Sequence, residues 1–429
     1  MMKNWDIKKL RDLADIRVSN VDKKIYPSER PVKLCNYMDV YANDYITGSI
    51  QFMKGSANDA ELERFGLNIG DVIITKDSET PDDIGIPTVI YEQIDNLVCG
   101  YHLALIRPDN EKIDSIFLSK YLSTSRVANY FALHASGSTR FGLPIGAIES
   151  VEILTPPKEE QKQIATVLST IDRAIAQTEA IIAKQQRIKT GLMQELLTKG
   201  IDENGNIRSE TTHEFKDSAI GRIPVEWEVK ELREVSLIID PNPSHRYPPS
   251  SDIGVPIAST ENFVGDNDFD LSVSEKVPFY VFEQQNQRCN FSQTDVVFAR
   301  KGRLGFARYY GESEKVFSHT VVIFKKRDEQ LLESHYLLWL VRFRDFFDQL
   351  DKRMNSNSGV PTLGVQFLGS VPVRIPKLSE QIQICSTLDS LEMRIEEEKR
   401  SLSKQKRQKT GLMQGLLTGK VRVTSLNKE

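Results

Sequence analysis

Apolar residues recur in two long segments of the chain at alternating intervals of four and three positions, with a few polar residues continuing the same spacing. This alternation is typical of the seam of a coiled coil, because it keeps a narrow apolar stripe on one side of a helix. The sequence therefore predicts two long helices, each of about 38 residues and about 57 Å at 1.5 Å per residue. The apolar seam residues are Ile164, Leu168, Ile171, Ile175, Ile182 and Leu192 in the first segment, and Ile384, Leu388, Leu391, Ile395, Leu402 and Leu412 in the second.

Both seams also contain a glutamine followed by a lysine at matching positions, Gln185 and Lys189 in the first and Gln405 and Lys409 in the second. Polar residues at such positions usually fix the register or the choice of partner helix. Two amphipathic helices that are buried separately would explain the apolar spacing, but not the matched polar residues. We therefore expect the two helices to pair as an antiparallel coiled coil, which would relate the two halves of the chain by a pseudo-twofold axis.

The two helical segments are copies of each other. KTGLMQELLTKG at 189–200 recurs as KTGLMQGLLTGK at 409–420, and NWDIKKLRDL at 4–13 matches EWEVKELREV at 226–235. A repeat of half the chain is far longer than the unit of a solenoid, so each copy is a globular domain followed by a helix. The expected parts are a first globular domain at 1–157, its helix at 158–200, a linker and turn at 201–224, a second globular domain at 225–377, its helix at 378–420 and a tail at 421–429.

Each globular domain mixes short strands with helix, which predicts an α+β fold. Strands are expected at 71–76, 103–108, 295–300 and 319–324, where apolar residues run together. Residues 113–133 and 330–352 carry Leu, Phe and Tyr at helical spacing, and each segment is predicted to form one helix packed on the sheet. The two domains agree in these elements and differ in their loops, which indicates two binding surfaces with different ligands. Neutral drift after duplication is the alternative.

Composition and charge narrow the class of protein. Charged residues make up 27% and hydrophobic residues 39% of the 429 residues, as in an ordinary soluble protein. The chain begins without the apolar core of a signal peptide, no apolar run is long enough to cross a bilayer, and the four cysteines are isolated. We therefore expect a cytoplasmic protein without structural zinc, disulfides or membrane contact. The net charge of −4 means that nucleic-acid binding needs a local basic surface or a basic partner.

The segment SAIGRIPVEWEVKELREV at 218–235, the divergent globular domains and the two KTGLMQ…LLT helices together resemble the specificity (S) subunit of a type I restriction-modification system. The resemblance covers nearly the whole chain, because the same parts recur twice in the same order. It implies a DNA-recognition subunit without a catalytic site, in which each target-recognition domain binds one half of an asymmetric, bipartite target in double-stranded DNA. The helices would set the distance between the half-sites.

The resemblance also implies partners. The helices are expected to bind two modification (methyltransferase) subunits, and restriction (translocase and endonuclease) subunits would join the complex in a prokaryotic cytoplasm. We expect this chain to bind no cofactor, because S-adenosylmethionine, ATP and Mg²⁺ would belong to those partner subunits.

The candidate DNA-contacting residues lie in loops around the expected strands. Arg300, Lys301 and Arg303 in ARKGRLG are the strongest candidates, because arginine can form two hydrogen bonds with guanine and glycine allows close approach of the backbone. Hydroxyl, amide and imidazole groups at matching places also suit phosphates or base edges, and an ordinary surface or structural role is the alternative for each. These further candidates are Lys76, Tyr101, His102, Ser136, Ser138, Thr139 and Arg140 in the first domain, and Ser318, His319, Ser356, Asn357 and Ser358 in the second. We expect no metal ligands.

Two other functions fit parts of the pattern. Asp71 with Lys76 faintly resembles the acidic residue and lysine of metal-dependent nucleases, and Asp295 with Lys301 is the matching pair. The second copy lacks the two carboxylates that would chelate a metal, which disfavours a nuclease. A coiled-coil scaffold that binds only proteins would explain the helices, but not two divergent globular domains.

Overall fold

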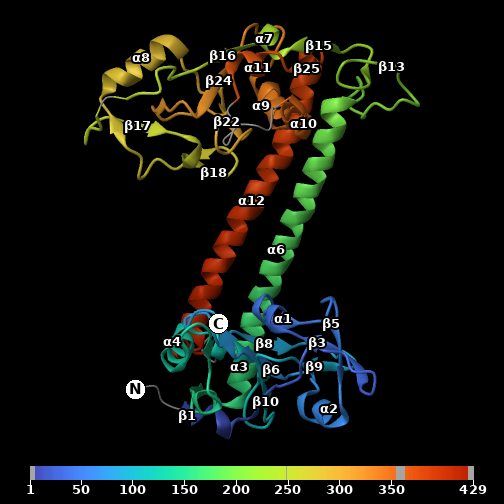
Figure 1. Cartoon of the computed structure of the whole chain (residues 1–429), viewed down its shortest axis with the longest axis vertical. Helices are drawn as coiled ribbons and strands as arrows, with labels where there is room; N and C mark the ends of the chain where they lie inside the picture. Colours follow the sequence, from blue (N-terminus) through green and yellow to red (C-terminus); the bar gives the residue numbers. More distant parts are fainter. Residues whose placement is uncertain (1–4, 248, 354–362, 424–429) are drawn as a thin grey trace. The chain divides into compact units, whose positions relative to one another are not determined.

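The structure of the chain is a computed structural model that describes residues 5–247, 249–353 and 363–423 (Figure 1). It divides into two compact units: unit 1 contains Met1–Ala180 and Lys399–Glu429, and unit 2 contains Ile181–Glu398. Unit 1 therefore holds the first globular domain, the start of the first long helix and the end of the second long helix. Unit 2 holds the second globular domain, the end of the first long helix and the start of the second. Each unit mixes helices and strands, so the predicted α+β class is confirmed.

A five-stranded sheet with the order β2-β10-β6-β8-β4 forms the centre of unit 1. All four residues of β6 and the first four of β10 are buried, which explains why the sequence shows continuous apolar runs there instead of alternation. A second sheet, β5-β3-β9, lies around its own core, which includes Cys35 and Cys99. The elements of unit 1 outside the long helices are β1 (Asp6–Lys9), β2 (Ala14–Val18), β3 (Arg30–Cys35), α1 (Tyr37–Tyr41), β4 (Tyr45–Ile46), β5 (Met53–Ala57), α2 (Asp59–Phe65), β6 (Val72–Thr75), β7 (Asp77–Ser78), β8 (Pro87–Ile90), β9 (Leu97–Cys99), β10 (Leu103–Pro108), α3 (Ser115–Leu122), α4 (Ser125–His134), β11 (Phe141–Gly142), α5 (Ile145–Glu149) and β12 (Glu152–Thr155).

Unit 2 repeats this plan with a four-stranded sheet, β16-β24-β21-β22, and a smaller sheet, β20-β17-β23. In both smaller sheets the middle strand has one antiparallel and one parallel neighbour, so the two domains share their topology. The elements of unit 2 outside the long helices are β13 (Phe215–Lys216), β14 (Ile223–Pro224), β15 (Glu228–Glu231), α7 (Leu232–Val235), β16 (Ser236–Ile239), β17 (Val255–Ala258), β18 (Phe263–Val264), β19 (Asp268–Phe269), β20 (Lys276–Val277), α8 (Phe279–Cys289), β21 (Val296–Ala299), β22 (Ala307–Tyr309), β23 (Val316–Phe317), β24 (Val321–Lys326), α9 (Ser334–Arg342), α10 (Arg344–Arg353), α11 (Val365–Gly369) and β25 (Pro372–Ile375).

The prediction of one helix at 113–133 and one at 330–352 is wrong, because each segment forms two short helices. In unit 1 the break falls between α3 and α4, where the hydroxyls of Ser123 and Thr124 donate to the carbonyls of Lys120 and Tyr121. These side-chain bonds satisfy carbonyls at the end of α3 and allow the chain to turn. In unit 2 the extended residue Phe343 separates α9 from α10.

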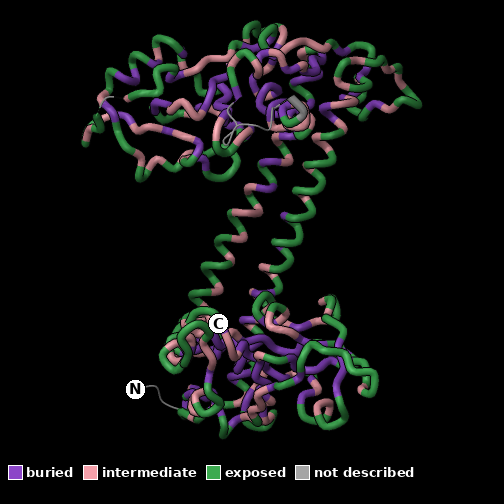
Figure 2. The backbone as a smooth tube through the Cα atoms, in the orientation of Figure 1, coloured by how far each residue is buried: buried purple, intermediate pink, exposed green. Residues whose placement is uncertain are grey.

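The two long helices form as predicted: α6 spans Lys158–Thr198 and α12 spans Leu378–Leu416. Every predicted apolar seam residue is buried or half-buried, whereas most residues between them are exposed (Figure 2). In unit 1, Lys409 Nζ lies 2.7 Å from the Asp172 carboxylate and Lys406 Nζ lies 2.7 Å from the Glu179 carboxylate. Earlier residues of α12 thus meet later residues of α6, which is the antiparallel order. Pairing along the whole length of the helices stays a prediction.

Each unit is completed by the end of the other copy's helix. Leu416 and Leu417 of α12 are buried in the core of unit 1, and Leu196 and Leu197 of α6 are buried in the core of unit 2. The duplicated dodecamer therefore has a structural reason. The same leucines recur because each set fills the core of the domain encoded by the opposite half of the chain.

Buried carboxylates near the start of each long helix make equivalent contacts. Glu160 of α6 accepts a hydrogen bond from the Trp5 indole at 3.2 Å and pairs with Arg422, which follows α12. Glu380 of α12 likewise accepts a hydrogen bond from the Trp227 indole at 3.1 Å. The start of one helix is thus joined both to its own domain and to the residues after the other helix.

The lysine of the KTGLMQ sequence also has the same role in both units. Lys409 pairs with Asp172 in unit 1, and Lys189 pairs with Glu392 in unit 2. Asp172 and Glu392 occupy matching positions in α6 and α12. In unit 1 the buried Lys120 adds a second cation at 2.7 Å from Asp172. The two lysines predicted to fix the helix register therefore take part in ion pairs between α6 and α12 within each unit, whereas the side-chain oxygens of Gln185 and Gln405 are buried without a hydrogen-bond partner in the described structure.

Candidate nucleic-acid interface

Three loops of unit 1 meet at one end of its main sheet. The backbone nitrogen of Lys76, just after β6, donates to the carbonyl of His102, just before β10, at 2.9 Å. The nitrogen of Leu143, after the predicted loop at 135–142, donates to the carbonyl of Lys76 at 2.8 Å. The structure therefore brings together the candidates of the first domain. We call this group surface 1: Lys76, Asp77, Tyr101, His102, Ser136, Ser138, Thr139 and Arg140.

Asp77 is the centre of surface 1, although no pattern in the sequence indicates this role. Its carboxylate accepts hydrogen bonds from Lys76 Nζ at 2.8 Å and from His102 Nδ1 at 2.5 Å. Burial opposes ionisation of Asp77, but the hydrogen bonds from Lys76 and His102 outweigh it and lower the pKa of the carboxyl. His102 has φ +74°, and its ring lies 3.9 Å from that of the half-exposed Tyr101. The carboxylate thus orients two cationic or donor groups toward this end of the sheet.

The loop at 136–140 adds exposed polar groups to surface 1. Ser136, Ser138, Thr139 and Arg140 are all exposed. Gly137 has φ +150°, and a Cβ there would lie 2.0 Å from the Arg140 carbonyl oxygen, so the tight turn requires glycine. The candidates of this loop are therefore free to contact a ligand, as a DNA-binding role requires.

Unit 2 has an equivalent meeting point. The nitrogen of Arg300, just after β21, donates to the carbonyl of Thr320 at 2.9 Å, and the nitrogen of Leu363 donates to the carbonyl of Arg300 at 2.9 Å. Ser318 and His319 lie just before β24 on the same side. We call this group surface 2: His245, Arg300, Lys301, Arg303, Ser318 and His319. Ser356, Asn357 and Ser358, the remaining candidates of this domain, lie outside the described residues.

Arg300 has a position that the sequence did not indicate. Its side chain is buried, with Nη2 donating to Asp240 at 2.6 Å and Nε donating to the carbonyl of His319 at 2.8 Å. Two of its donor groups are therefore used inside the domain, which suits a residue that positions its neighbours. Lys301 is half-buried and Arg303 is exposed, and Arg303 Nη1 donates to the Phe263 carbonyl at 2.8 Å. Base contact by any of these three residues stays a prediction.

His245 is a member of surface 2 that sequence reasoning missed. Its ring stacks on that of His319, with centroids 4.5 Å apart and planes at 23°. Burial lowers the pKa of His319, and the nearby His245, Lys301 and Arg300 lower it further. No spacing pattern joins residues so far apart in the chain. The two stacked rings place hydrogen-bonding nitrogens beside a cationic loop.

The nuclease-like pairs of the sequence are not formed. Asp71 precedes β6 and receives two hydrogen bonds from Arg107, whereas Lys76 follows the same strand. Asp295 precedes β21 and pairs with Lys325 at 2.6 Å, whereas Lys301 lies beyond the other end. Each acid and its expected lysine lie at opposite ends of a strand, which is wrong for a shared catalytic site.

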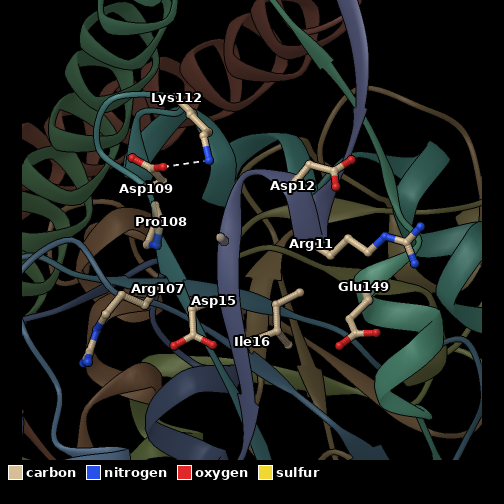
Figure 3. Close-up of a pocket in the computed structure, with 10 residues that line it drawn as sticks. Arg11, Asp12, Asp15, Ile16, Arg107, Pro108, Asp109, Lys112 and Glu149 are labelled. Atoms are coloured by element: carbon tan, nitrogen blue, oxygen red, sulfur yellow. Dashed lines mark ion pairs between the residues drawn. The ribbon is translucent and has the colours of Figure 1, made fainter.

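A hollow of about 530 Å³ in unit 1 is lined by Arg107 and Pro108 at the end of β10 (Figure 3). His102 lies just before the other end of this strand. Side chains of both signs line it, including Arg107 and the ion pair between Asp109 and Lys112 at 2.9 Å. Arg107 is already bonded to Asp71. None of the predicted DNA-contacting residues lines this hollow, and its mixed charges do not favour a polyanion.

Three carboxylates in unit 2 lie close enough to hold a cation. Ligand oxygens of Asp266, Glu392 and Glu396 lie within 4.8 Å of one another. Lys189 pairs with Glu392 and has Nζ 3.9 Å from Asp266, so its ammonium group already supplies positive charge there. Burial raises the pKa of the Glu392 carboxyl, and Asp266 adds to this rise. We therefore interpret this cluster as an ion-pair contact that joins the loop containing Asp266 to α6 and α12 within unit 2.

Comparisons with known proteins agree on one family. The family model described as "Type I restriction modification DNA specificity domain" matches the chain twice, over residues 2–186 and 224–404. The putative type I restriction enzyme MjaX specificity subunit of Methanocaldococcus jannaschii is 23% identical over 433 residues, covering 98% of this chain and 94% of that protein. The MjaVIII specificity subunit of the same organism is 28% identical over 288 residues, covering 65% and 64%.

Solved structures share the fold. The crystal structure of a type I restriction-modification S subunit from M. genitalium has a TM-score of 0.59, with 15% identity and coverage of 96% of each chain. A chain from a structure described for complex assembly and conformational transition of the type I R-M system has a TM-score of 0.53 and 15% identity, covering 97% of this chain and 98% of that one. Among the described residues, no helix is long and apolar enough to span a membrane.

Proposed function

Because this chain belongs to the family of type I restriction-modification DNA specificity domains, we propose that it recognises a bipartite DNA target, with one half-site bound by each unit. The observation that carries the proposal is the pair of surfaces 1 and 2. They occupy equivalent ends of equivalent sheets in one chain, yet they present different side chains. Two equivalent positions with different chemistry suit two different DNA sequences.

The charge of the chain supports recognition inside a larger complex. Most of the affinity for duplex DNA comes from phosphate neutralisation, and the chain has a net charge of −4. Surfaces 1 and 2 would supply contacts to base edges and a few phosphates. We propose that modification subunits supply much of the remaining contact with the backbone.

The long helices would set the distance between the half-sites. Each helix begins in one unit and ends in the other, and its last leucines are buried in the domain encoded by the opposite half. Changing the helix length without also moving these leucines would therefore be costly. Half-site spacing in a DNA-binding protein follows from the distance between its recognition elements.

Matching exposed residues on the two helices support two equivalent docking positions for modification subunits. Arg187, Thr190 and Gln194 are exposed on α6, and the same residue types recur on α12 as Arg407, Thr410 and Gln414. Other exposed positions differ, as at Ile188 and Gln408. On α12 the shared residues Arg407 and Thr410 line a shallow hollow of about 420 Å³.

Gly191 and Gly411 strengthen this assignment. Both lie inside a long helix, both are exposed, and a Cβ at either position would meet nothing within 4 Å. Glycine inside a helix costs about 1 kcal/mol relative to alanine, so its presence in both copies without a packing reason in this chain favours close approach by a partner. Two copies of one surface would bind two copies of one partner.

A scaffold that binds only proteins is the second candidate. It would use the same exposed helix residues, but it would leave surfaces 1 and 2 without a role. The two candidates differ in a gel-shift measurement with the modification subunits present. Sequence-specific retention of DNA supports the first, and its absence supports the second.

The decisive experiment maps methylated adenines in the host genome and then replaces residues 1–157 with those of another family member. We expect a bipartite methylated motif in which the replacement changes one half only. Alteration of both halves, or of neither, would contradict recognition by separate units.

A further inference from the structure

A hollow of about 170 Å³ in unit 2 lies between α8 and the loop at 241–247. Its walls carry an excess of hydrogen-bond donors. Arg246 comes from the loop and Arg288 from the last turn of α8, and no aspartate or glutamate lines the hollow. Polar groups of Ser244, Tyr280 and Gln284 complete the wall.

The side chain of Asn242 provides an independent sign of a missing ligand. Asn242 is only 5% exposed and lines the hollow. Its Oδ1 accepts a hydrogen bond from Ser244 Oγ at 2.9 Å, whereas its Nδ2 interacts with the Tyr247 hydroxyl but makes no hydrogen bond of ordinary geometry in the described structure. Buried donors without a partner are rare, because they lose water without gaining a hydrogen bond. This amide therefore points to an acceptor that binds from outside the chain.

The two arginines indicate the charge of that acceptor. Arg246 and Arg288 are both exposed, and within the described residues neither guanidinium is paired with a carboxylate. A guanidinium carries five N–H donors and no acceptor, whereas a phosphate carries acceptors only. A base edge presents donors as well as acceptors, so it complements these walls less well than a phosphate does.

The hollow and surface 2 include neighbouring residues of the chain. His245 stacks on His319, and the next residue, Arg246, lines the hollow. We propose that Asn242, Arg246 and Arg288 bind a backbone phosphate of the DNA half-site that unit 2 recognises. This inference rests on the proposed function, and it adds a contact that fixes the position of the duplex on surface 2.

The equivalent place in unit 1 carries a different set of charges among the described residues. Its helix α2, like α8, follows a strand that is antiparallel to the middle strand of the smaller sheet. Both helices have an arginine in the last turn, Arg64 in α2 and Arg288 in α8, but the first turn of α2 also carries Asp59 and Glu61. We assign the contact to the second half-site because the hollow itself lies in unit 2.

The test uses the full chain assembled with its modification subunits and a fluorescently labelled duplex that carries the methylated motif. Affinity is measured against salt concentration for the wild type, for the double variant Arg246→Gln/Arg288→Gln and for Arg344→Gln. The control changes an arginine on α10 whose side chain is 87% exposed. We expect the double variant to lose about one unit of the slope of log affinity against log salt, with affinity about tenfold lower, and the control to match the wild type.

Ethylation of individual phosphates locates the contact. We expect one phosphate beside the second half-site at which ethylation weakens the wild type but not the double variant. A wild-type slope in the double variant, or a lost contact at the first half-site, overturns the phosphate site while leaving the proposed function intact. Absence of sequence-specific binding by the wild type overturns the proposed function itself.

Discussion

Arg300 and Lys301 are neighbours in sequence, but the structure gives them separable roles. Arg300 forms a buried ion pair with Asp240, and Lys301 is less buried and makes no ion pair in the described part of the chain. Removing one partner of a buried pair leaves an uncompensated charge, so Arg300→Gln should lower the free energy of unfolding by about 3 kcal/mol. Lys301→Gln should change it by less than about 0.5 kcal/mol but weaken DNA binding. Urea unfolding and DNA titration of both variants check this, and equal stability of the two would contradict it.

Lys315 of unit 2 gives a prediction for stability against pH. It is 1% exposed, lies over the ring of Tyr310 at 4.2 Å, and donates to Ser313. Burial lowers the pKa of Lys315 to about 8. The unfolded chain keeps an ordinary lysine pKa of about 10.4, so between these values the unfolded state binds more protons and stability rises with pH.

The matched variant is Lys315→Met. The difference in unfolding free energy between wild type and Lys315→Met should be constant below pH 8 and should shift in favour of the wild type as the pH rises toward about 10.4. Taking the difference cancels the titration of buried cysteines and tyrosines, which both proteins share. A difference that does not change with pH would contradict the assignment.

Sequence reasoning located some members of surface 1 and surface 2 and missed others. Lys76, His102 and His319 could be placed because they flank apolar strands that the sequence shows clearly. Asp77 could not be recognised as their centre, and Asp240 and His245 come from a loop far from β21 and β24 in the sequence. Their contacts depend on how the smaller sheet packs, which no local pattern reports.

If each half of the chain folded independently, each long helix would contact only the domain of its own half. The ends of the long helices depart from this expectation. Leu416 and Leu196 are each 1% exposed in the core of the domain encoded by the other half of the chain. Leu416→Ala should therefore destabilise unit 1, and Leu196→Ala should destabilise unit 2, each by about 2–5 kcal/mol. Hydrogen exchange of peptides from each unit checks this. If each variant instead lost protection in the globular domain of its own half of the chain, the placement of each helix end in the opposite domain would be contradicted.

Gly191 and Gly411 provide the test of partner docking. Alanine at either position should make the helix about 1 kcal/mol more stable and should weaken partner binding less than a larger side chain does, because it adds only one methyl group to the surface. Gly191→Gln or Gly411→Gln should remove one of two binding sites for the modification subunit, and the double variant should remove both. Titration calorimetry measures the number of sites.

The matched control for this series is Ile188→Gln, which gives α6 the residue found at position 408 in α12. It is exposed and lies outside the shared residues, so it should leave both sites intact. Equal binding by the glutamine and alanine variants at Gly191 would contradict docking at this face.

At the scale of elements, periodicity was informative where a helix has one continuous apolar stripe. The 4-3 spacing predicted the ends of both long helices to within a few residues, because an apolar seam that continues over more than four heptads is typical of a long helix in a coiled coil. The same kind of reasoning failed at 113–133 and 330–352. There the apolar spacing continues across a break that is made by hydrogen bonds of Ser123 and Thr124 and by the extended Phe343.

At the scale of the whole molecule, duplication explains why one chain can bind an asymmetric target. Each half supplies one of surfaces 1 and 2, one helix start and one helix end, and neither half contains the complete core of its own unit. The two surfaces are thus free to diverge while the residues that join the halves stay matched. The duplicated leucines, lysines and buried carboxylates are the matched set, and surfaces 1 and 2 are the divergent set.

The proposed spacer role of the helices predicts how a change in their length should alter the DNA target. Four residues inserted near position 180 of α6 and near position 400 of α12 should lengthen each helix by about 6 Å, close to two base pairs of duplex. Four residues advance a helix by slightly more than one turn, so the seam moves by only about 40° and the helices can still pair.

Both insertions together should therefore lengthen the unread segment between the methylated half-sites by about two base pairs and leave the half-site sequences unchanged. Insertion into α6 alone should abolish binding, because Leu196 and Leu197 could then no longer reach the core of unit 2 while Lys409 keeps its contact with Asp172 in unit 1. Genome-wide mapping of methylated adenines measures the spacing. An unchanged spacing in the double insertion would show that something other than these helices sets the distance.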